Sequence, residues 1–475
     1  MNTTLKADVC VVGGGSGGFA AALRAAQAGC RTVLIEKERL LGGNSTVCGV
    51  NCWEPVAGAA YGLPRELYDR MRQVPGGCGV YRNAMHYCLK DPARNDFPGG
   101  LYRIDPSLDY DDTLKQGFPY GCSFPEIMNY WHGVIFEPRV LDRCVRQMLR
   151  EAGCRIITGH ACAETESRDG HISSIRLDDG RRITAKIWID NCGVLAASAG
   201  CRLFMGQEAK SQYDEPDAPD RPGIATLNGV TLIFRVTPAG NTKKIFPGCT
   251  PRRASMVATE YPNGDYNCNM LPTMAGREFF VMDRESSMRE MQRRVRDFWC
   301  YVQTNFPWGR NYRLKSICVR PGIRESFRIQ CHYMLNENDL LAGLKSQKHP
   351  DLTVIADHHM DLHGAKNPGR IVQPYGIPYR SLLPEGTDNL LVAGRIGGFS
   401  CLAASSCRLS RTVIRLGEAA GYAAALALRN KCPLRSVDIR QLQCLMHFEE
   451  ERQLLSESAM RQPAASRAGS IDNEP

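Results

Sequence analysis

The start of the chain alternates between short apolar runs and an alanine-rich stretch, which is the pattern of a strand–helix–strand unit. Residues 7–12 form a β-branched run of the kind that lies buried in a parallel sheet. Residues 19–28 are rich in alanine and favour a helix, which Gly29 is placed to end. A second apolar run, residues 31–36, ends in an acidic residue. We therefore predict two parallel strands connected by a helix that packs against them.

The alternation of helix and strand resumes further along the chain. Residues 139–152 have the pattern of a helix, and residues 155–158 have that of a strand. Asp-Gly pairs at 169–170 and 179–180 separate alternating β runs, which predicts a three-stranded meander. The meander returns to the sheet through the apolar residues 187–189.

One more buried strand is predicted late in the chain. Residues 389–395 form an apolar run that ends in a glycine and an arginine, and a helix rich in small residues follows. That helix carries Gly417 and Gly421 in a G-x-x-x-G pattern. These glycines either contact a ligand or let two helices pack closely, and the sequence favours neither interpretation.

The first strand and helix are joined by a G-x-G-x-x-G motif formed by Gly13, Gly15 and Gly18. In this motif the first glycine makes a tight turn, the second lets the backbone approach a pyrophosphate, and the third lets the helix lie close to the sheet. The helix N-terminus, beginning near Ser16, then faces the phosphate charge. Glu36 ends the second strand and is placed to accept hydrogen bonds from a ribose diol. An empty glycine turn with a solvated Glu36 is the alternative, but the agreement of strand, helix and acid favours dinucleotide binding.

The residues that follow Glu36 indicate which dinucleotide binds. Residues 41–51 contain a glycine pair, Gly42 and Gly43, which resembles the pair that follows the acid in two-dinucleotide-binding-domain flavoproteins. In that superfamily the segment runs along the FAD pyrophosphate and reaches the isoalloxazine ring. A strand near the end of the chain that closes onto the same cofactor, as predicted for residues 389–395, is needed by an FAD fold and not by an NAD domain. We therefore expect FAD.

The resemblance extends over nearly the whole chain. The sequence is similar to the FAD-dependent oxidoreductase family often named beside xanthan lyase, within the fumarate reductase and glutathione reductase flavoprotein superfamily. The matching stretches, in the order that the family has, are 42–55, 190–200, 322–335, 375–380, 388–395 and 417–427. Two departures lie near the expected flavin. Asn191 and Cys192 stand in a motif that reads D-A-T-G in relatives, and Cys401 stands where many relatives carry a histidine, so the sequence leaves covalent attachment of the flavin open.

The resemblance implies an α/β fold class. It implies a Rossmann-like FAD-binding domain with a parallel central sheet and a β-meander, discontinuous in sequence, plus an α+β substrate domain. The expected FAD-binding domain comprises residues 1–60, 131–204 and 358–430, and the expected substrate or cap domain comprises residues 61–130 and 205–357. We expect a C-terminal helix over residues 431–461 and a disordered tail over residues 462–475. The predicted cofactor-binding residues are Gly13, Gly15, Ser16, Gly18, Glu36, Lys37, Gly42, Gly43, Asn44, Ser45, Thr46, Gly193, Gly394 and Arg395.

The chemistry expected at the flavin is transfer of a hydride between a small polar organic substrate and flavin N5. The association of relatives with polysaccharide-degrading systems suggests a sugar-derived compound or a hydroxy acid as that substrate. Oxidation of a C–OH or C–NH bond needs a base beside the leaving proton, and histidine is the commonest base near neutral pH. Residues 357–363 hold the densest group of histidines in the chain. We predict His363 as the base, Asp361 as the acid that orients its ring, and His359 as the second candidate. A metal site and a surface loop with chance histidines are the alternatives, and no third metal ligand follows from the spacing.

A second polar concentration lies in residues 320–328, which contain three arginines, Arg320, Arg324 and Arg328. Arg324 is predicted to clamp a substrate carboxylate or hydroxyl, because guanidinium groups bind such groups in a forked geometry. Arg328 either shares this role or ties two domains together by ion pairs. Arg380 and Arg395 lie near the flavin in the family pattern. Trp53 follows the glycine pair and either lines the substrate pocket or packs in the core.

The sequence also offers partial signals for two other functions. Cys48 and Cys52 suggest a dithiol–disulfide reductase, but those enzymes carry a second G-x-G-x-x-G for NAD(P)H, and none occurs in residues 60–475. A flavin-dependent RNA-modifying enzyme would use basic charge for phosphate contacts, but the sequence has no basic-aromatic tract. A small-molecule substrate is therefore favoured, with an electron acceptor or donor that the sequence does not identify.

Composition narrows the class of protein further. The chain has 475 residues, a 43% hydrophobic fraction and a net charge of +9 that is spread along its length, which is typical of a globular protein and does not favour a nucleic-acid partner. Its 21 cysteines include no C-x-x-C pair, which favours reduced thiols and no metal site. We expect a cytoplasmic protein with no signal peptide and no membrane span. Whether copies of the chain associate stays open.

Overall fold

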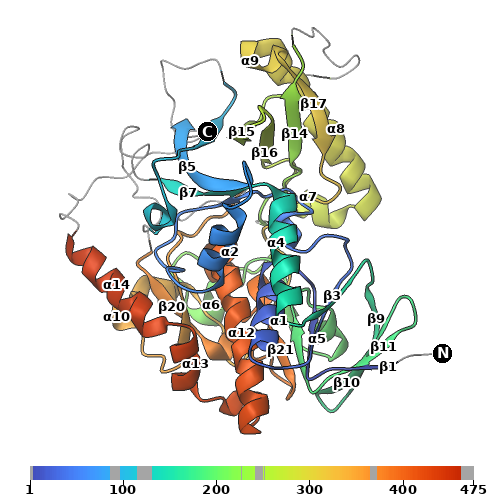
Figure 1. Ribbon diagram of the computed structural model, residues 1–475, viewed down its shortest axis with the longest axis vertical. Coiled ribbons are helices and arrows are strands. Elements are labelled where there is room, and N and C mark those ends of the chain that lie inside the picture. Colours follow the sequence, from blue (N-terminus) through green and yellow to red (C-terminus); the bar gives the residue numbers. More distant parts are fainter. Residues whose placement is uncertain are drawn as a thin grey trace.

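The computed structural model describes residues 4–85, 97–114, 131–225, 227–240, 250, 252–363 and 372–461. It confirms the predicted α/β fold class with a parallel central sheet and a meander. In Figure 1 the parallel sheet and its helices occupy the lower half, and a second, larger sheet with its own helices occupies the upper half. The expected tail, residues 462–475, lies outside the described residues.

The parallel sheet gathers its strands from three separate parts of the chain. Its order is β21-β12-β2-β3-β8, with every neighbouring pair parallel. The strands are β2 (Val9–Val12), β3 (Thr32–Glu36), β8 (Arg155–Thr158), β12 (Ile187–Asp190) and β21 (Leu390–Val392). All of β2 is buried, because alternate residues face two different cores. Val9 and Val11 pack with the helices, whereas Cys10 and Val12 pack with the meander.

Helices cover one face of the parallel sheet and the meander covers the other. The covering helices are α1 (Ser16–Gln27), α4 (Pro138–Glu151) and α12 (Ser410–Asn430). The meander strands are β9 (Cys162–Arg168), β10 (His171–Leu177) and β11 (Arg182–Thr184). They turn at the predicted Asp-Gly pairs, where Asp169, Gly170 and Gly180 adopt the left-handed conformation that such turns require. The N-terminal strand β1 (Thr4–Lys6) extends this sheet by pairing parallel to β11.

The larger sheet has eight strands in the order β17-β14-β16-β15-β6-β5-β7-β4. Their bounds are β4 (Cys52–Trp53), β5 (Cys78–Met85), β6 (Gly100–Ile104), β7 (His132–Phe136), β14 (Phe234–Pro238), β15 (Ser255–Glu260), β16 (Tyr266–Leu271) and β17 (Tyr312–Ile317). Helices α7 (Gly276–Val281), α8 (Arg284–Asn305) and α9 (Pro307–Arg310) accompany it. β4 and β7 pair in this sheet although the sequence analysis assigned their residues to the FAD-binding domain.

The remaining elements are short connections and peripheral helices. They are α2 (Leu63–Met71), α5 (Val194–Ser198), β13 (Leu203–Phe204), α6 (Lys210–Tyr213), β18 (Arg328–Ile329), α10 (Glu337–Ser346), β19 (Leu352–Ala356), β20 (Tyr375–Pro378), α11 (Cys401–Cys407), α13 (Ile439–Leu445), α14 (Phe448–Arg461) and the 3₁₀ turns η1 (Gly43–Ser45), η2 (Tyr110–Thr113), η3 (Tyr379–Leu382), η4 (Gly394–Ile396) and η5 (Leu434–Ser436). The single C-terminal helix expected over residues 431–461 is wrong in detail. Residues 439–461 form two helices, because His447 adopts a left-handed conformation that ends the first of them.

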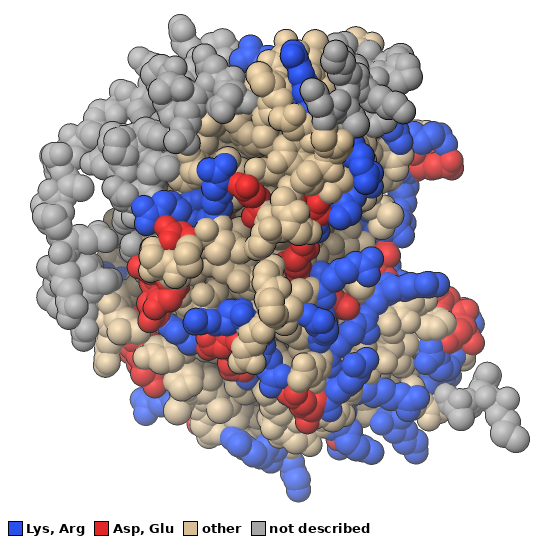
Figure 2. Space-filling view, turned by 45° about the horizontal axis from the view of Figure 1, so that its top comes forward, with Lys and Arg blue, Asp and Glu red and all other residues tan. Residues whose placement is uncertain are grey.

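The structure also bears on the expectations about charge distribution, membrane spans and reduced cysteines. On the face shown in Figure 2, Lys and Arg side chains are interspersed with Asp and Glu side chains. No helix among the described residues combines the length and the apolar character needed to cross a membrane. Seventeen of the described cysteines are free thiols, whereas Cys300 is disulfide-bonded, which departs from the expectation of reduced thiols throughout.

The two glycines of the G-x-x-x-G pattern serve helix packing. A Cβ added at Gly417 would lie 2.1 Å from the carbonyl oxygen of Gly17, and one added at Gly421 would lie 2.4 Å from that of Ala21. Helices α1 and α12 therefore touch through their backbones. Neither glycine lines the cavity described below.

We predict that Gly421→Ala lowers the stability of the protein by about 1–3 kcal/mol, because the added methyl meets backbone that cannot move aside. The shift in the midpoint of urea-induced unfolding measures the effect. Gly223→Ala is the control, since a Cβ there would meet only the amide of Ala225 at 3.9 Å. Equal midpoints for the two variants would contradict backbone contact between the helices.

Candidate active site

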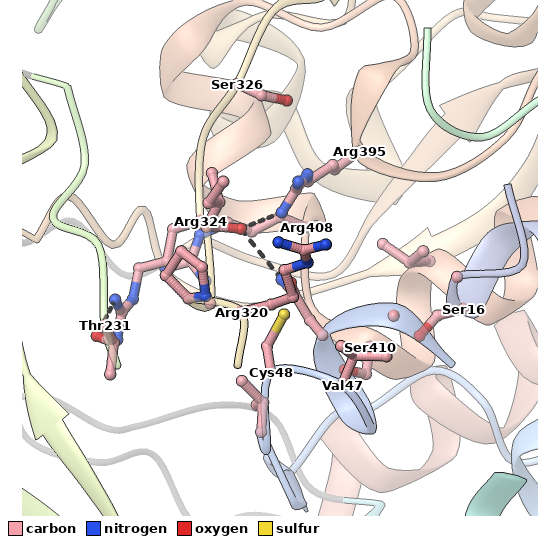
Figure 3. A pocket seen from close by; sticks show the side chains of 18 of the residues that line it. Ser16, Val47, Cys48, Thr231, Arg320, Arg324, Ser326, Arg395, Arg408 and Ser410 are labelled. Carbon is pink, nitrogen blue, oxygen red and sulfur yellow. Dashed lines mark hydrogen bonds between the residues drawn. The ribbon is translucent and has the colours of Figure 1, made fainter. Parts of the chain in front are cut away.

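A cavity of about 860 Å³ lies between the parallel sheet and the eight-stranded sheet. Part of its lining is drawn in Figure 3, where Ser16 and Cys48 come from the N-terminal part of the chain and Arg324, Arg395 and Arg408 from its second half. Twelve of the predicted site residues line it together: Gly13, Gly15, Ser16, Glu36, Lys37, Gly43, Asn44, Arg324, His359, Asp361, His363 and Arg395. Cofactor and catalytic candidates that are far apart in sequence therefore share one chamber.

The glycine loop, residues 13–18, lies at one wall of the cavity with its backbone exposed to the interior. Gly13 is left-handed, with φ +98°, and a Cβ on Gly18 would lie 1.7 Å from the carbonyl oxygen of Gly13. At Gly15 a Cβ would meet the side-chain amide of Asn191 at 2.8 Å. The loop can adopt this turn only with glycine at these positions, and helix α1 begins directly after it at Ser16.

Glu36 closes the same wall at the end of β3. Its Oε2 accepts a hydrogen bond of 2.6 Å from the Gly14 amide, and its Oε1 accepts one of 2.8 Å from the Glu38 amide. Burial raises the pKa of Glu36 above its ordinary value. The two amides hold the carboxylate at the cavity surface, where it can accept further hydrogen bonds.

The predicted residues that do not line the cavity shape the backbone around it. Gly42 and Gly193 adopt left-handed conformations, and Gly394 does so with φ +83°. The Thr46 hydroxyl donates to the Leu41 carbonyl at 2.7 Å, and Ser45 Oγ lies 3.4 Å from Ser410 Oγ. These contacts fix the turn that follows the glycine pair.

The unusual Asp-Asn-Cys-Gly motif lies where three segments meet. Asp190 accepts hydrogen bonds from the amides of Gly193, at 2.7 Å, and Ala196, at 2.9 Å, and so caps the start of α5. The Asn191 amide, oriented to satisfy both neighbours, accepts from the Gly15 amide at 3.3 Å and donates to the Ala393 carbonyl at 3.1 Å. Asn191 thereby connects the glycine loop to the end of β21.

Arg395 carries a partly buried positive charge on the cavity wall. Its guanidinium donates to the Ile323 carbonyl, which also accepts a hydrogen bond of 3.1 Å from Asn44 Nδ2 (Figure 3). Burial lowers the pKa of Arg395, and no carboxylate among the described residues pairs with it. A cation that is partly shielded from water and has no counterion is stabilised by an anion, so this site favours an anionic ligand.

These features fit FAD. The glycine loop presents backbone where a Cβ would leave no room, Glu36 stands where a ribose diol is bound, and Arg395 offers charge to an anion. The residues that would hold FAD are therefore the glycine loop, Glu36, Asn44 and Arg395. When bound, FAD supplies two-electron redox chemistry that the side chains of the protein lack.

The histidine segment, residues 357–363, enters the cavity beside this wall. His363 Nε2 lies 2.9 Å from Asp361 Oδ2, and Arg408 donates to the same oxygen at 2.7 Å. Burial works to raise the pKa of Asp361, but the hydrogen bond from His363 and the charge of Arg408 hold it well below its usual range. Asp361 is therefore a carboxylate that orients the His363 ring.

The cavity histidines are held in their neutral form. Burial lowers the pKa of His363, and the charge of Arg324 lowers it further, although Asp361 works in the opposite direction. Burial also lowers the pKa of His359. The rings of His358 and His359 stack with centroids 4.2 Å apart, and burial holds the pKa of His358 well below its ordinary value.

Arg324 lies beside the same histidine. Its guanidinium donates to the Gly229 carbonyl at 2.9 Å and to the Thr231 hydroxyl at 2.7 Å, and Figure 3 shows the side chain directed toward Thr231. The Gly229 amide in turn donates to the His363 carbonyl at 2.6 Å. One backbone stretch therefore positions both the arginine and the histidine.

The structure places three other candidates away from the cavity. Trp53 packs in the core, with its ring centroid 5.3 Å from that of Phe136. Arg380 pairs with Asp351, and Arg328 is buried in ion pairs with Glu208, at 2.7 Å, and Glu325, at 3.2 Å. Both ion pairs lie within the expected substrate domain, residues 205–357, so they give Arg328 a structural role there without joining the two expected domains. Arg328 also donates to the carbonyls of Phe399 and Gly206, whereas Arg380 lies over the Tyr333 ring and within 3.5 Å of His349 Nδ1.

Cys48 and Cys52 line the cavity but are poor redox thiols. Burial raises the pKa of Cys48 to about 12 and that of Cys52 well above its ordinary value. A disulfide reductase needs an accessible thiolate, which these surroundings disfavour. The geometry therefore argues against the disulfide-reductase alternative.

Sequence reasoning missed several cavity residues. The most notable is Glu54, whose Oε2 accepts hydrogen bonds from the Tyr81 hydroxyl at 2.8 Å and from Trp131 Nε1 at 2.9 Å. Arg408 was missed as well, and Asn191 was noted as a departure from the family motif without a role. Glu54 lies in the 42–55 stretch that carried the family resemblance, and this was the one signal that pointed to it.

Within the part of the chain that the structure describes, one group of three side chains comes close enough together to share a metal ion. It consists of His160, Asp178 and Asp179, which lie on and around the meander and do not line the cavity. Exposed acidic groups of this kind are common without a metal, and the group carries no assignment.

Comparison with known proteins identifies the family. A family model described as FAD dependent oxidoreductase matches residues 8–446 of the chain. The chain belongs to this FAD-dependent oxidoreductase family. It is an FAD-dependent oxidoreductase, and its cofactor is FAD. The expectation drawn from the family resemblance is confirmed.

Curated relatives match this FAD oxidoreductase over short stretches. Dihydrolipoyl dehydrogenase, mitochondrial, of Caenorhabditis elegans is 49% identical over 51 residues, which are 11% of this chain and 10% of that protein. 4-Oxocyclohex-2-ene-1-carboxylate 5-dehydrogenase of Sinomonas cyclohexanicum is 42% identical over 68 residues, 14% of this chain and 12% of that protein. The matched region thus spans about a tenth of the length of these relatives.

Solved structures resemble the FAD oxidoreductase over more of its length. A geranylgeranyl bacteriochlorophyll reductase-like protein from Thermoplasma acidophilum is 13% identical with a TM-score of 0.45, covering 95% of this chain and 84% of that chain. p-Nitrophenol 4-monooxygenase PnpA from Pseudomonas putida DLL-E4 is 13% identical with a TM-score of 0.44, covering 96% of this chain and 89% of that chain.

We predict that Glu36→Gln weakens FAD binding by about 10-fold or more, because a neutral amide replaces the charged acceptor for the ribose hydroxyls. The FAD content of purified protein and the dissociation constant from flavin fluorescence measure the change. Glu164→Gln, at an exposed acid paired with Arg176 on the meander, serves as the control. An unchanged FAD content in the Glu36 variant would show that the ribose is held elsewhere.

Proposed function

We propose that this FAD oxidoreductase transfers a hydride between flavin N5 and a small organic substrate, at a carbon that carries a hydroxyl or an amine. The observation that supports the proposal is the shared cavity. It brings the glycine loop and Arg395, which would hold FAD, into one chamber with the His363–Asp361 pair. Such a chamber allows substrate, base and cofactor to meet.

In this proposal His363 accepts the proton that leaves the substrate heteroatom. Because the Asp361 carboxylate accepts a hydrogen bond from Nε2, that nitrogen carries the ring proton and Nδ1 keeps its lone pair. The lowered pKa keeps the ring neutral at pH 7, as a base requires. Arg408 holds Asp361 in place and keeps it ionised.

Arg324 would act as the substrate clamp. It lines the cavity close enough to His363 for its charge to lower the pKa of that ring. Hydrogen bonds to Gly229 and Thr231 fix the direction of its guanidinium. A positioned guanidinium binds a carboxylate or hydroxyl of the substrate and orients the reacting carbon.

We predict that His363→Ala lowers kcat about 10²- to 10⁴-fold while FAD content stays normal, because proton transfer loses its base. Steady-state turnover and the flavin absorption spectrum of the same sample measure the two quantities. His349→Ala is a matched control, since His349 forms a comparable 2.8 Å pair with Asp339 and does not line the cavity. Undiminished turnover in the His363 variant would remove His363 as the base.

The pH profile offers a second prediction. Activity should fall as the pH drops through the pKa of His363, which lies below 6.5, since protonation removes the base. The charge of Arg324 lowers that pKa, so Arg324→Gln should move the acidic limb of kcat to higher pH. Arg324→Lys keeps the charge and should leave the limb in place. A limb that does not move in the Gln variant would contradict the assignment of this limb to His363.

A further inference from the structure

We propose that Glu54 binds the ammonium group of an amine substrate whose apolar body lies against the eight-stranded sheet. This inference rests on the proposed function and narrows its substrate class from hydroxyl or amine compounds to amines. It assigns a role to a cavity carboxylate that the proposed reaction does not otherwise use.

The hydrogen bonds around Glu54 prepare it as an acceptor. The Tyr81 hydroxyl and Trp131 Nε1 both donate to Oε2, and Cys52 Sγ lies 3.6 Å from Oε1 as a further donor. Trp131 Nε1 also lies 3.0 Å from the Tyr81 hydroxyl, which fixes that hydroxyl as a donor to Glu54. Every side-chain partner is therefore a donor, and donors stabilise the ionised form of a carboxylate.

Within the described parts of the chain, the carboxylate of Glu54 has no counterion. Among the described residues no lysine or arginine side chain pairs with its carboxylate, in contrast to Glu38 with Arg320 and Asp361 with Arg408. Burial raises the pKa of Glu54, and the nearby charge of Asp361 adds to this effect. Burial and the charge of Asp361 both disfavour the ionised form of Glu54. A cationic ligand would offset these two effects, whereas a neutral or anionic ligand would not.

The surroundings of Glu54 define the rest of the ligand. Tyr102, Trp131, Val257 and Leu271 pack with one another and line the cavity, and we call them the sheet wall. Tyr102 is stacked on Tyr81 with ring centroids 4.2 Å apart and an interplanar angle of 8°. Aromatic faces attract an ammonium group, and the aliphatic side chains accommodate apolar surface.

This wall also disfavours a sugar. Each hydroxyl of a polyol loses its hydrogen bonds to water on entering the cavity and needs a polar partner there. The polar groups of the sheet wall are the indole N–H of Trp131 and the hydroxyl of Tyr102. The Trp131 N–H already donates to Glu54 and Tyr81. An amine on an apolar body brings one charged group, for which the Glu54 carboxylate and the aromatic faces of the sheet wall are suitable partners.

The test compares three ligands that share one apolar body: phenethylamine, 2-phenylethanol and phenylacetate. Each is titrated into the FAD-loaded enzyme, and the dissociation constant is taken from the change in flavin absorbance. We expect phenethylamine to bind about 10- to 100-fold more tightly than either of the others, as a hydrogen bond to a charged group implies. Glu54→Gln keeps an acceptor oxygen for Tyr81 and Trp131 but removes the charge, and should abolish this preference.

Glu260→Gln is the matched control, because Glu260 lies on the same sheet, pairs with Arg103 and does not line the cavity. Equal affinity for the amine and the alcohol, no detectable binding of any probe, or an unchanged amine affinity in the Glu54 variant would overturn the inference. Flavin reduction by alcohols alone, abolished by His363→Ala, would overturn it while leaving the proposed function intact. Failure of the proposed function would instead appear as turnover that persists without His363.

Discussion

The architecture of the cavity depends on backbone-to-backbone contact around the glycine loop. A Cβ at Gly17 would lie 2.9 Å from the amide of Gly394, and one at Gly417 would lie 2.1 Å from the carbonyl of Gly17. The start of α1 therefore meets the end of β21 and the middle of α12 at backbone distance, and the Asn191 side chain fills the one small gap beside Gly17, 2.8 Å from a Cβ built there. Because no side chain can adjust at such a contact, the wall that presents the glycine loop to FAD has little freedom to shift.

The parts of the fold that the sequence predicted are those encoded by local signals. Strand β2, helix α1 and strand β3 follow from hydrophobic periodicity and from glycines close together in the chain, and the meander follows from two Asp-Gly turns. The pairing of β4 with β7 joins residues near 52 to residues near 135, and no local pattern specifies that partnership. The break at His447 was missed because it depends on one residue adopting a conformation that its type rarely takes.

The same division applies to the candidate site. His363 and Asp361 lie two residues apart, so their D-x-H spacing was visible in the sequence, and the cavity brings them together with Arg324. Arg408 and Glu54 acquire their importance from partners that are distant in the chain, Asp361 for the first and Trp131 for the second. Tertiary proximity decides such roles, and an isolated sequence does not contain it.

Some charged side chains of the cavity are paired within the protein, whereas others face the space for a ligand. Glu38 neutralises Arg320, and Arg408 pairs with Asp361, so these charges are balanced within the protein. Arg395 and Glu54 have no such balance among the described residues, and each lies against a different ligand surface. Arg395 adjoins the glycine loop and Asn44, where FAD supplies negative charge. Glu54 adjoins the sheet wall, where a substrate ammonium would supply positive charge. Each of the two ligands would thus neutralise a side-chain charge that has no counterion among the described residues.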